Sequence, residues 1–82
     1  MAKLIKTDGT VTEVKPAKGK KFTLAEAQGY VGGYVEMVRL RTGFMLVDEE
    51  GLLTGKPLNM AASGFAGLDL VGDVLLCTAG EF

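Results

Sequence analysis

The chain has 82 residues, 48% of them hydrophobic, and a formal net charge of −1, so it forms a single domain, residues 1–82, with a small core. Its single cysteine excludes an internal disulfide, and it has no histidine to help hold a stabilising metal ion. Because this apolar content exceeds what a small monomer buries, we expect a homo-oligomer, with a monomer that exposes some leucines as the alternative.

Residues 3–7 and 10–15 predict a β-hairpin at the start of the chain. The dipeptide between them, Asp8-Gly9, is typical of a type I′ turn, in which both central residues adopt positive φ. Pro16 ends the second strand because proline cannot donate to a strand ladder. The loop at 17–21 contains glycine and lysine but lacks the spaced glycines of a phosphate-binding loop, so we exclude that function for it.

Thr23 and Glu26 form the pattern of a capping box, which predicts the start of a helix. The residues of one apolar face recur at helical spacing: Leu24, Ala27 and Val31. Gly32-Gly33 ends the helix after about two turns. Because so short a helix is unstable alone, we expect it to pack this face on the sheet.

Residues 34–40 predict the central strand of the fold, because apolar residues on both faces are typical of an interior strand. Glu36 and Arg39 are the exceptions. A charge on such a strand is costly to bury unless it is paired. Each side chain therefore either lies near an edge or in a cross-strand ion pair, or contacts a ligand or a second subunit. A turn at 41–43 leads to an antiparallel partner strand at 44–48.

The carboxyl-terminal half predicts a short helical turn and one more strand. Residues 48–51 are a solvated turn whose carboxylates lack the alternation of a calcium loop. Asn59 caps a helical turn that Ser63-Gly64 ends. Gly72-Asp73 then turns the chain into residues 74–78, an apolar run suited to an interior strand.

The predicted fold class is therefore α+β. It consists of a small mixed, mainly antiparallel sheet of about five strands, one two-turn helix and a short second helical turn. The expected order along the chain is strand, strand, helix, strand, strand, helical turn, strand.

Three segments carry a family resemblance: Val31–Leu40, then Val47–Gly51 leading into Lys56–Ala62, and finally Val71–Cys77. In this order and spacing, together with the amino-terminal hairpin, the chain resembles the small phage and bacterial family catalogued as domain of unknown function 3846. The resemblance implies a small accessory protein of a phage or mobile element, with no activity attached to the family. Ala62-Ser63 departs from the Ala-Thr pair usual in the family, which affects only a local helix cap.

Nothing in the sequence indicates an enzyme. It has no histidine, no serine or cysteine beside a recognisable base, and no metal-ligand spacing. Glu36 and Asp48 would be the pair for acid and base catalysis if neighbouring strands brought them together. Cys77 has no base to activate it as a nucleophile. We expect no catalytic residue, no metal site and no cofactor.

The leading functional hypothesis is an oligomeric binder that counters host defence by sequestering an anionic, nucleotide-type signal such as a cyclic nucleotide. In this hypothesis the pocket lies at a subunit interface, Arg39 or Arg41 binds the phosphates, Tyr30 or Tyr34 stacks on a base, and Glu36 also contacts the ligand. These five residues are the predicted ligand-binding set. The hypothesis requires that they converge.

The alternative hypothesis is a protein–protein interaction module that inhibits or regulates a host or phage protein. Its support is the acidic segment 48–50 beside the apolar pair Leu52 and Leu53, which together would form a recognition edge.

Direct nucleic-acid binding ranks third. Residues 1–23 carry six lysines against two acidic residues, whereas residues 24–82 carry three basic against eight acidic residues. Lysines on edge strands ordinarily discourage aggregation, and the net charge near zero argues against a broad phosphate-binding surface.

We expect no membrane partner, because no run of about 18 apolar residues is present. The first residues also return to charge too quickly for a secretory signal. The unpaired Cys77 is typical of a reducing cytoplasm, that of the host cell if the protein is phage-encoded.

Overall fold

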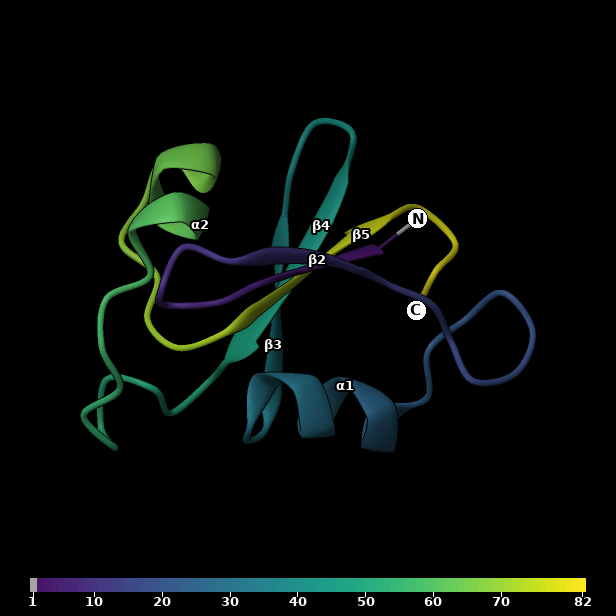
Figure 1. The fold of residues 1–82 in the computed structure, drawn as a ribbon, viewed down its shortest axis with the longest axis horizontal. Helices are drawn as coiled ribbons and strands as arrows, with labels where there is room; N and C mark the ends of the chain where they lie inside the picture. Colours follow the sequence, from purple (N-terminus) through teal and green to yellow (C-terminus); the bar gives the residue numbers. More distant parts are fainter. Residues whose placement is uncertain (1) are drawn as a thin grey trace.

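The computed structural model describes residues 2–82; Met1, the first residue of the predicted domain, lies outside the described residues. The chain forms β1 (Ala2–Ile5), β2 (Val11–Val14), α1 (Leu24–Val31), β3 (Val35–Arg39), β4 (Gly43–Asp48), α2 (Met60–Ala66) and β5 (Val74–Thr78). Within the described residues the strands form one five-stranded sheet in the order β2-β1-β5-β4-β3 (Figure 1), and its neighbouring strands are antiparallel. The predicted α+β class and the order of elements are confirmed.

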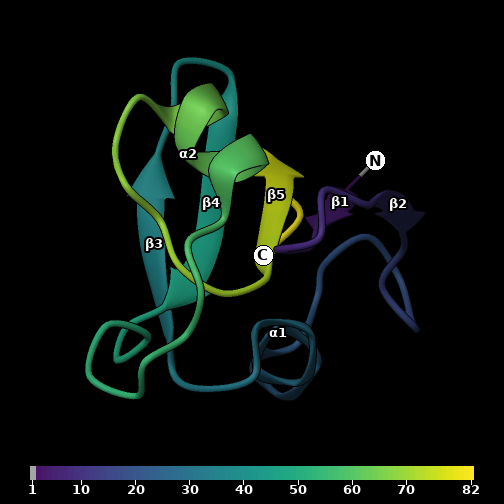
Figure 2. The same cartoon turned by 60° about the vertical axis from the view of Figure 1, so that its left-hand side comes forward.

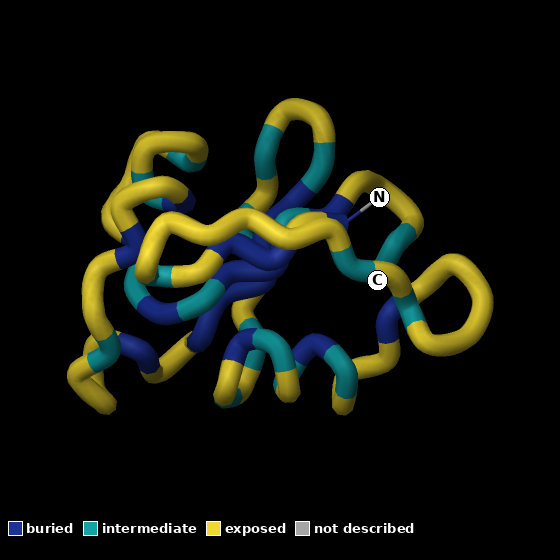
Figure 3. Tube along the Cα trace, viewed as in Figure 1, coloured by how far each residue is buried: buried dark blue, intermediate teal, exposed yellow. Residues whose placement is uncertain are grey.

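The two helices lie on opposite faces of the sheet (Figure 2). Alternate residues of β4 and β5 point to opposite faces, so each strand supplies both cores. The larger core lies under α1 and consists of Ala2, Phe22, Ala27, Val31, Phe44, Leu46, Leu75 and Cys77. The smaller core lies under α2 and consists of Ile5, Met45, Val47, Ala62, Leu70 and Val74. Burial is concentrated in these central strands (Figure 3).

The prediction that residues 34–40 form the central strand is wrong. β3 is an edge strand that pairs only with β4 among the described strands, and the centre of the sheet is β5, which lies between β1 and β4. The prediction relied on the apolar residues on both faces of β3, a pattern that is typical of an interior strand but is present here on an edge strand. Met37 is 41% exposed, which an edge position allows. The charges of Glu36 and Arg39 are consistent with an edge strand, where charged side chains discourage pairing with other chains.

The amino-terminal hairpin is confirmed, but its turn is not type I′. That turn requires positive φ at two residues, whereas Asp8 has no positive φ and only Gly9 adopts one, at 91°. The Gly9 amide donates to the Lys6 carbonyl at 3.0 Å, and the Lys6 amide donates to the Thr10 carbonyl at 2.9 Å. This is a three-residue loop with glycine in the left-handed region.

The capping box predicted for α1 is confirmed. The Glu26 amide donates to the Thr23 hydroxyl at 3.1 Å, and the Glu26 carboxylate accepts from the Thr23 amide at 2.9 Å. Gly32 ends the helix with φ of 83°, a conformation that glycine adopts without strain. Leu24 was predicted on the buried face, but it is 54% exposed.

The predicted end of the second helical turn at Ser63-Gly64 is also wrong. Asn59 is the N-cap, as predicted, but α2 continues to Ala66 and is capped by Gly67. The Ser63 hydroxyl accepts from the Leu70 amide at 2.7 Å and donates to the Leu70 carbonyl at 3.2 Å. This tie holds the returning segment against α2.

Candidate functional site

The predicted tyrosines and arginines lie near opposite ends of β3, and Glu36 lies on the strand between them. Tyr30, in the last turn of α1, is half-buried and stacks edge-on against Phe22, with ring centroids 6.0 Å apart. Tyr34 lies in the connection to β3 and is 66% exposed. Its carbonyl accepts from the Glu49 amide at 2.8 Å. The two tyrosines therefore flank the end of α1 and the start of β3.

The arginines lie at the other end of β3. Arg39 is the last residue of the strand, and Arg41 lies in the turn to β4. At about 3.3 Å per residue, roughly 16 Å of strand separates Tyr34 from Arg39. Glu36 is opposite Val47 and so points to the α2 face, whereas Arg39 is opposite Phe44 and points to the α1 face. One chain does not bring these groups together.

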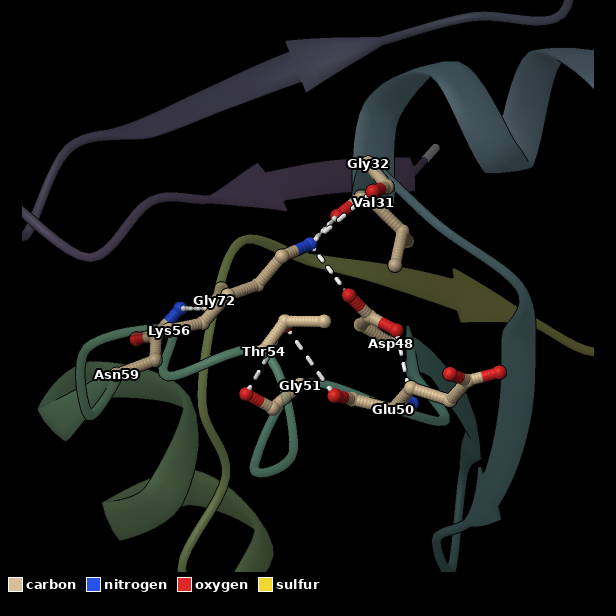
Figure 4. Close-up of polar contacts among 9 residues, drawn as sticks. All are labelled: Val31, Gly32, Asp48, Glu50, Gly51, Thr54, Lys56, Asn59 and Gly72. Atoms are coloured by element: carbon tan, nitrogen blue, oxygen red, sulfur yellow. Dashed lines mark hydrogen bonds and ion pairs between the residues drawn. The ribbon is translucent and has the colours of Figure 1, made fainter.

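An ion pair between the buried Asp48 and the partly exposed Lys56, which was not predicted, joins β4 and the loop before α2 to the end of α1. Lys56 contacts the Asp48 carboxylate, and its ammonium also donates to the Val31 carbonyl at 3.0 Å and the Gly32 carbonyl at 3.2 Å (Figure 4). The Asp48 side chain is only 4% exposed. The lysine therefore caps the negative end of α1 and neutralises a buried carboxylate at the same time.

The backbone lies close to both side chains of this ion pair at two glycines. A Cβ on Gly33 would lie 2.9 Å from the Asp48 carboxylate, and one on Gly72 would lie 2.8 Å from the Lys56 side chain. The hydrogen bond from Lys56 is the main cause that lowers the pKa of Asp48, and a bond from the Glu50 amide adds to it. The glycines at 32, 33 and 72 were the sequence signal that could have indicated this site, because glycine commonly marks a position where another group lies close to the backbone.

The ion pair fixes the base of a compact loop that presents two leucines. The amides of Thr54 and Lys56 donate to the carbonyls of Glu50 and Gly51, each at 3.0 Å, and close the loop on itself. At its tip, Leu52 is 82% and Leu53 is 85% exposed. The loop is therefore braced from within while its two largest apolar side chains face solvent.

Asn59 braces the other end of the same segment. It is fully buried, and its amide group donates to the carbonyls of Ile5 and Gly72, each at 2.9 Å. Its side-chain oxygen accepts from the Ala62 amide at 3.0 Å, which caps α2. This one side chain ties the start of α2 to β1 and to the segment before β5.

Most of the exposed large apolar residues belong to one segment of the chain, which includes α2. Of the ten large hydrophobic residues that are exposed in residues 2–82, six lie between positions 52 and 68. We call this set the apolar flank; it consists of Leu52, Leu53, Leu58, Met60, Phe65 and Leu68. α2 itself buries Ala62 and turns Met60 and Phe65 outward. Four members of this set, Leu52, Leu58, Met60 and Leu68, line two adjoining clefts, and exposed apolar residues grouped in this way mark interaction surfaces.

Two clefts run through the apolar flank and share a wall. One, of about 260 Å³, lies between the β3–β4 pair and the segment after α2, and Leu52 and Leu68 are among its lining residues. The other, of about 350 Å³, is lined by residues that include Leu58, Met60 and Leu68. Asp69 lines both. The first cleft is smaller than an ordinary small-molecule pocket and the second is at the lower end of that size range, and each can accept a side chain or two.

Cys77 is a core residue of β5. It is 2% exposed, and burial raises the pKa of its thiol to about 12. Because the thiolate is the reactive form, the side chain acts as a small apolar group rather than as a nucleophile at neutral pH.

The whole of this architecture, residues 3–82, matches the family described as Domain of unknown function (DUF3846). The chain belongs to this family. The resemblance inferred from the segments around β3, Lys56 and β5 is therefore confirmed. No curated protein and no solved structure matches the chain.

Residues 2–82 contain no group of three or more acidic or cysteine side chains placed to hold a metal ion. None of the helices in this range is long and apolar enough to cross a membrane.

Proposed function

We propose that this member of the family is a non-enzymatic protein-binding module that inhibits or regulates a host or phage protein. The observation that carries the proposal is the apolar flank, with Leu52 and Leu53 almost fully exposed on a braced loop. Exposure of an apolar side chain to water is unfavourable in free energy, and a partner that covers the side chain on binding removes this exposure. A loop fixed before binding loses little conformational freedom when the partner arrives.

The recognition edge differs in one residue from the one expected from the sequence. Asp48 is buried against Lys56, so its carboxylate is not available to a binding partner. Glu49 and Glu50 are exposed and remain beside the leucines. The proposed surface is therefore the apolar flank with these two carboxylates at its border, extended by α2, which the sequence did not place there.

Sequestration of a nucleotide-type signal is the second candidate. Tyr30 lines a cleft of about 460 Å³ with Lys56, Thr7 and Asp73, but Lys56 is already committed to Asp48 and to the end of α1. A phosphate site would need Arg39 or Arg41 from another copy. This candidate thus depends on homo-oligomers, which native mass spectrometry would detect together with any retained small molecule.

The experiment that tests the protein-binding proposal is affinity capture from host lysate with matched variants. Leu52→Ser combined with Leu53→Ser removes the apolar tip of the loop, and Leu24→Ser removes an exposed leucine on the opposite side of the sheet. We expect a stoichiometric protein partner that the Leu24 variant retains and the loop variant loses by at least about tenfold. Equal capture by both variants, or a retained nucleotide with no protein partner, would contradict the proposal.

A further inference from the structure

The cleft between β3 and the segment after α2 has an apolar floor and an acidic rim. Its floor and walls include Val38, Val47, Leu52, Leu68, Leu70 and Val71. The same cleft is lined by the exposed acidic residues Glu36, Glu49 and Asp69. Because Glu36 lies opposite Val47 in the strand pair, its side chain is on the face where the cleft opens.

The three acidic side chains are not neutralised by the chain itself. Within residues 2–82 none of them makes an ion pair or a side-chain hydrogen bond. Residues 42–82 contain a single basic residue, Lys56, and it is held by Asp48 and the end of α1. The negative charge at the rim is thus left for an external group.

This charge pattern distinguishes between the possible occupants of the cleft. A second copy joined face to face through a two-fold axis would bring two acidic rims together, and like charges across an interface are unfavourable. An acidic partner meets the same obstacle. A basic partner gains from the rim and still fills the apolar floor, because lysine and arginine lay their aliphatic stems along apolar surface.

The second cleft extends the first in one direction. The two share Leu68 and Asp69, and Leu58 and Met60 line the far part. Two adjacent apolar depressions accept two side chains from one face of a helix, as in other helix-in-groove complexes. A helix supplies such side chains at positions three or four residues apart.

We propose that this double cleft binds a basic amphipathic helix of the partner protein, with apolar side chains in the two depressions and lysine or arginine against Glu36, Glu49 and Asp69. This inference rests on the proposed function and specifies the chemistry of the partner. The acidic rim selects a basic partner over an acidic one and speeds its association, whereas the apolar floor supplies most of the binding free energy.

The test uses two synthetic helical peptides of about four turns, with identical leucine positions and either lysine or glutamate at the flanking positions. Fluorescence anisotropy measures their binding to the purified protein. We expect the lysine peptide to bind at least about tenfold more tightly than the glutamate peptide, with an affinity that falls as salt is added. Equal binding of the two peptides would overturn the inference.

Matched variants assign the effect to the cleft. Glu36→Gln with Asp69→Asn removes two charges from the rim, and Asp8→Asn with Glu13→Gln removes two from the amino-terminal hairpin. We expect the rim pair to weaken the lysine peptide about fivefold or more and the hairpin pair to leave it within about twofold. Leu68→Ser, compared with Leu24→Ser, makes the same test for the apolar floor. If the rim pair and the hairpin pair weakened binding of the lysine peptide equally, the effect would come from the net charge of the protein, and the assignment of the site to the cleft would be overturned.

Failure of this inference is distinguishable from failure of the proposed function. A captured partner that depends on Leu52 and Leu53 but is insensitive to the rim pair leaves the protein-binding function standing and refutes a basic occupant. Absence of any protein partner, alongside rim-dependent binding of the lysine peptide, supports the chemistry of the cleft and counts against the proposed function.

Discussion

α1 and α2 are built with the same local devices but face solvent differently. Each begins at a side-chain cap and ends at a glycine in the left-handed conformation, Gly32 and Gly67. α1 buries Ala27 and Val31 and is held at its carboxyl end by Lys56. α2 buries Ala62 and exposes Met60 and Phe65. α1 exposes one large apolar side chain, Leu24, whereas α2 exposes two, so α2 is the helix with the larger apolar outer face available to a partner.

The largest effect is expected from removing the ion pair that anchors α1. Lys56→Met keeps the aliphatic stem but leaves the Asp48 carboxylate buried without a counter-charge, which costs about 3 kcal/mol of unfolding free energy. Urea denaturation followed by circular dichroism measures the loss. Lys18→Met, in the exposed loop before α1, is the control and should change stability by less than about 0.5 kcal/mol.

A double variant sharpens this result. Asp48→Asn combined with Lys56→Met removes both charges, so it should be more stable than Lys56→Met alone, because the unpaired buried carboxylate is gone. A double variant that is less stable than the single one would contradict this account, because it would show that the Asp48 carboxylate stabilises the fold without Lys56, through its hydrogen bond from the Glu50 amide.

The two N-caps should differ in strength. Asn59→Ala removes three buried hydrogen bonds and leaves the carbonyls of Ile5 and Gly72 without that donor, so we expect a loss of about 2–3 kcal/mol. Thr23→Ala removes an exposed cap of α1 and should cost only about 1 kcal/mol. Thermal and urea unfolding of the two variants side by side would test the ranking, and equal losses would contradict it.

Acid should act on the α1 anchor through Asp48. Its pKa is lowered by Lys56 in the folded chain, so its contribution to stability is present above its unfolded pKa of about 3.9 and is lost as pH falls through its lower folded value. Asp48→Asn cannot titrate, and we expect its unfolding free energy to fall less steeply than that of the wild type below about pH 4. Parallel slopes in urea titrations at several acidic pH values would count against this role.

The smallest effect on stability is expected on the outer face of α2. Met60→Ser and Phe65→Ser remove side chains that are already 76% and 63% exposed, so unfolding free energy should change by less than about 0.5 kcal/mol. The same variants should weaken capture of a protein partner. A large loss of stability would instead place these side chains in the core and break the contrast with α1.

Local features of the chain were predictable because they depend on residues a few positions apart. The capping box of Thr23 and Glu26, the cap at Asn59 and the stop at Gly32 all follow from short-range hydrogen bonding. The hairpin at Asp8-Gly9 was predicted, but its turn type was not, because a dipeptide does not fix the φ of both its residues.

Features that join distant segments were not predictable in the same way. The order of strands is set by β5, which lies between the two hairpins, and the pattern of apolar residues in β3 does not indicate this order. Lys56 reaches Val31 across 25 positions. The exposure of Leu24 and of the outer face of α2 likewise depends on how far the sheet extends beneath each helix.

The position of β5 has a consequence for how the molecule assembles. The β1–β2 hairpin and the β3–β4 hairpin pair only through β5 in the described sheet. Until residues 74–78 are synthesised and inserted, the two hairpins are separate pieces without a common sheet. The complete sheet therefore forms only once residues 74–78 pair with both hairpins, and we expect this long-range closure to be slower than the formation of either hairpin alone.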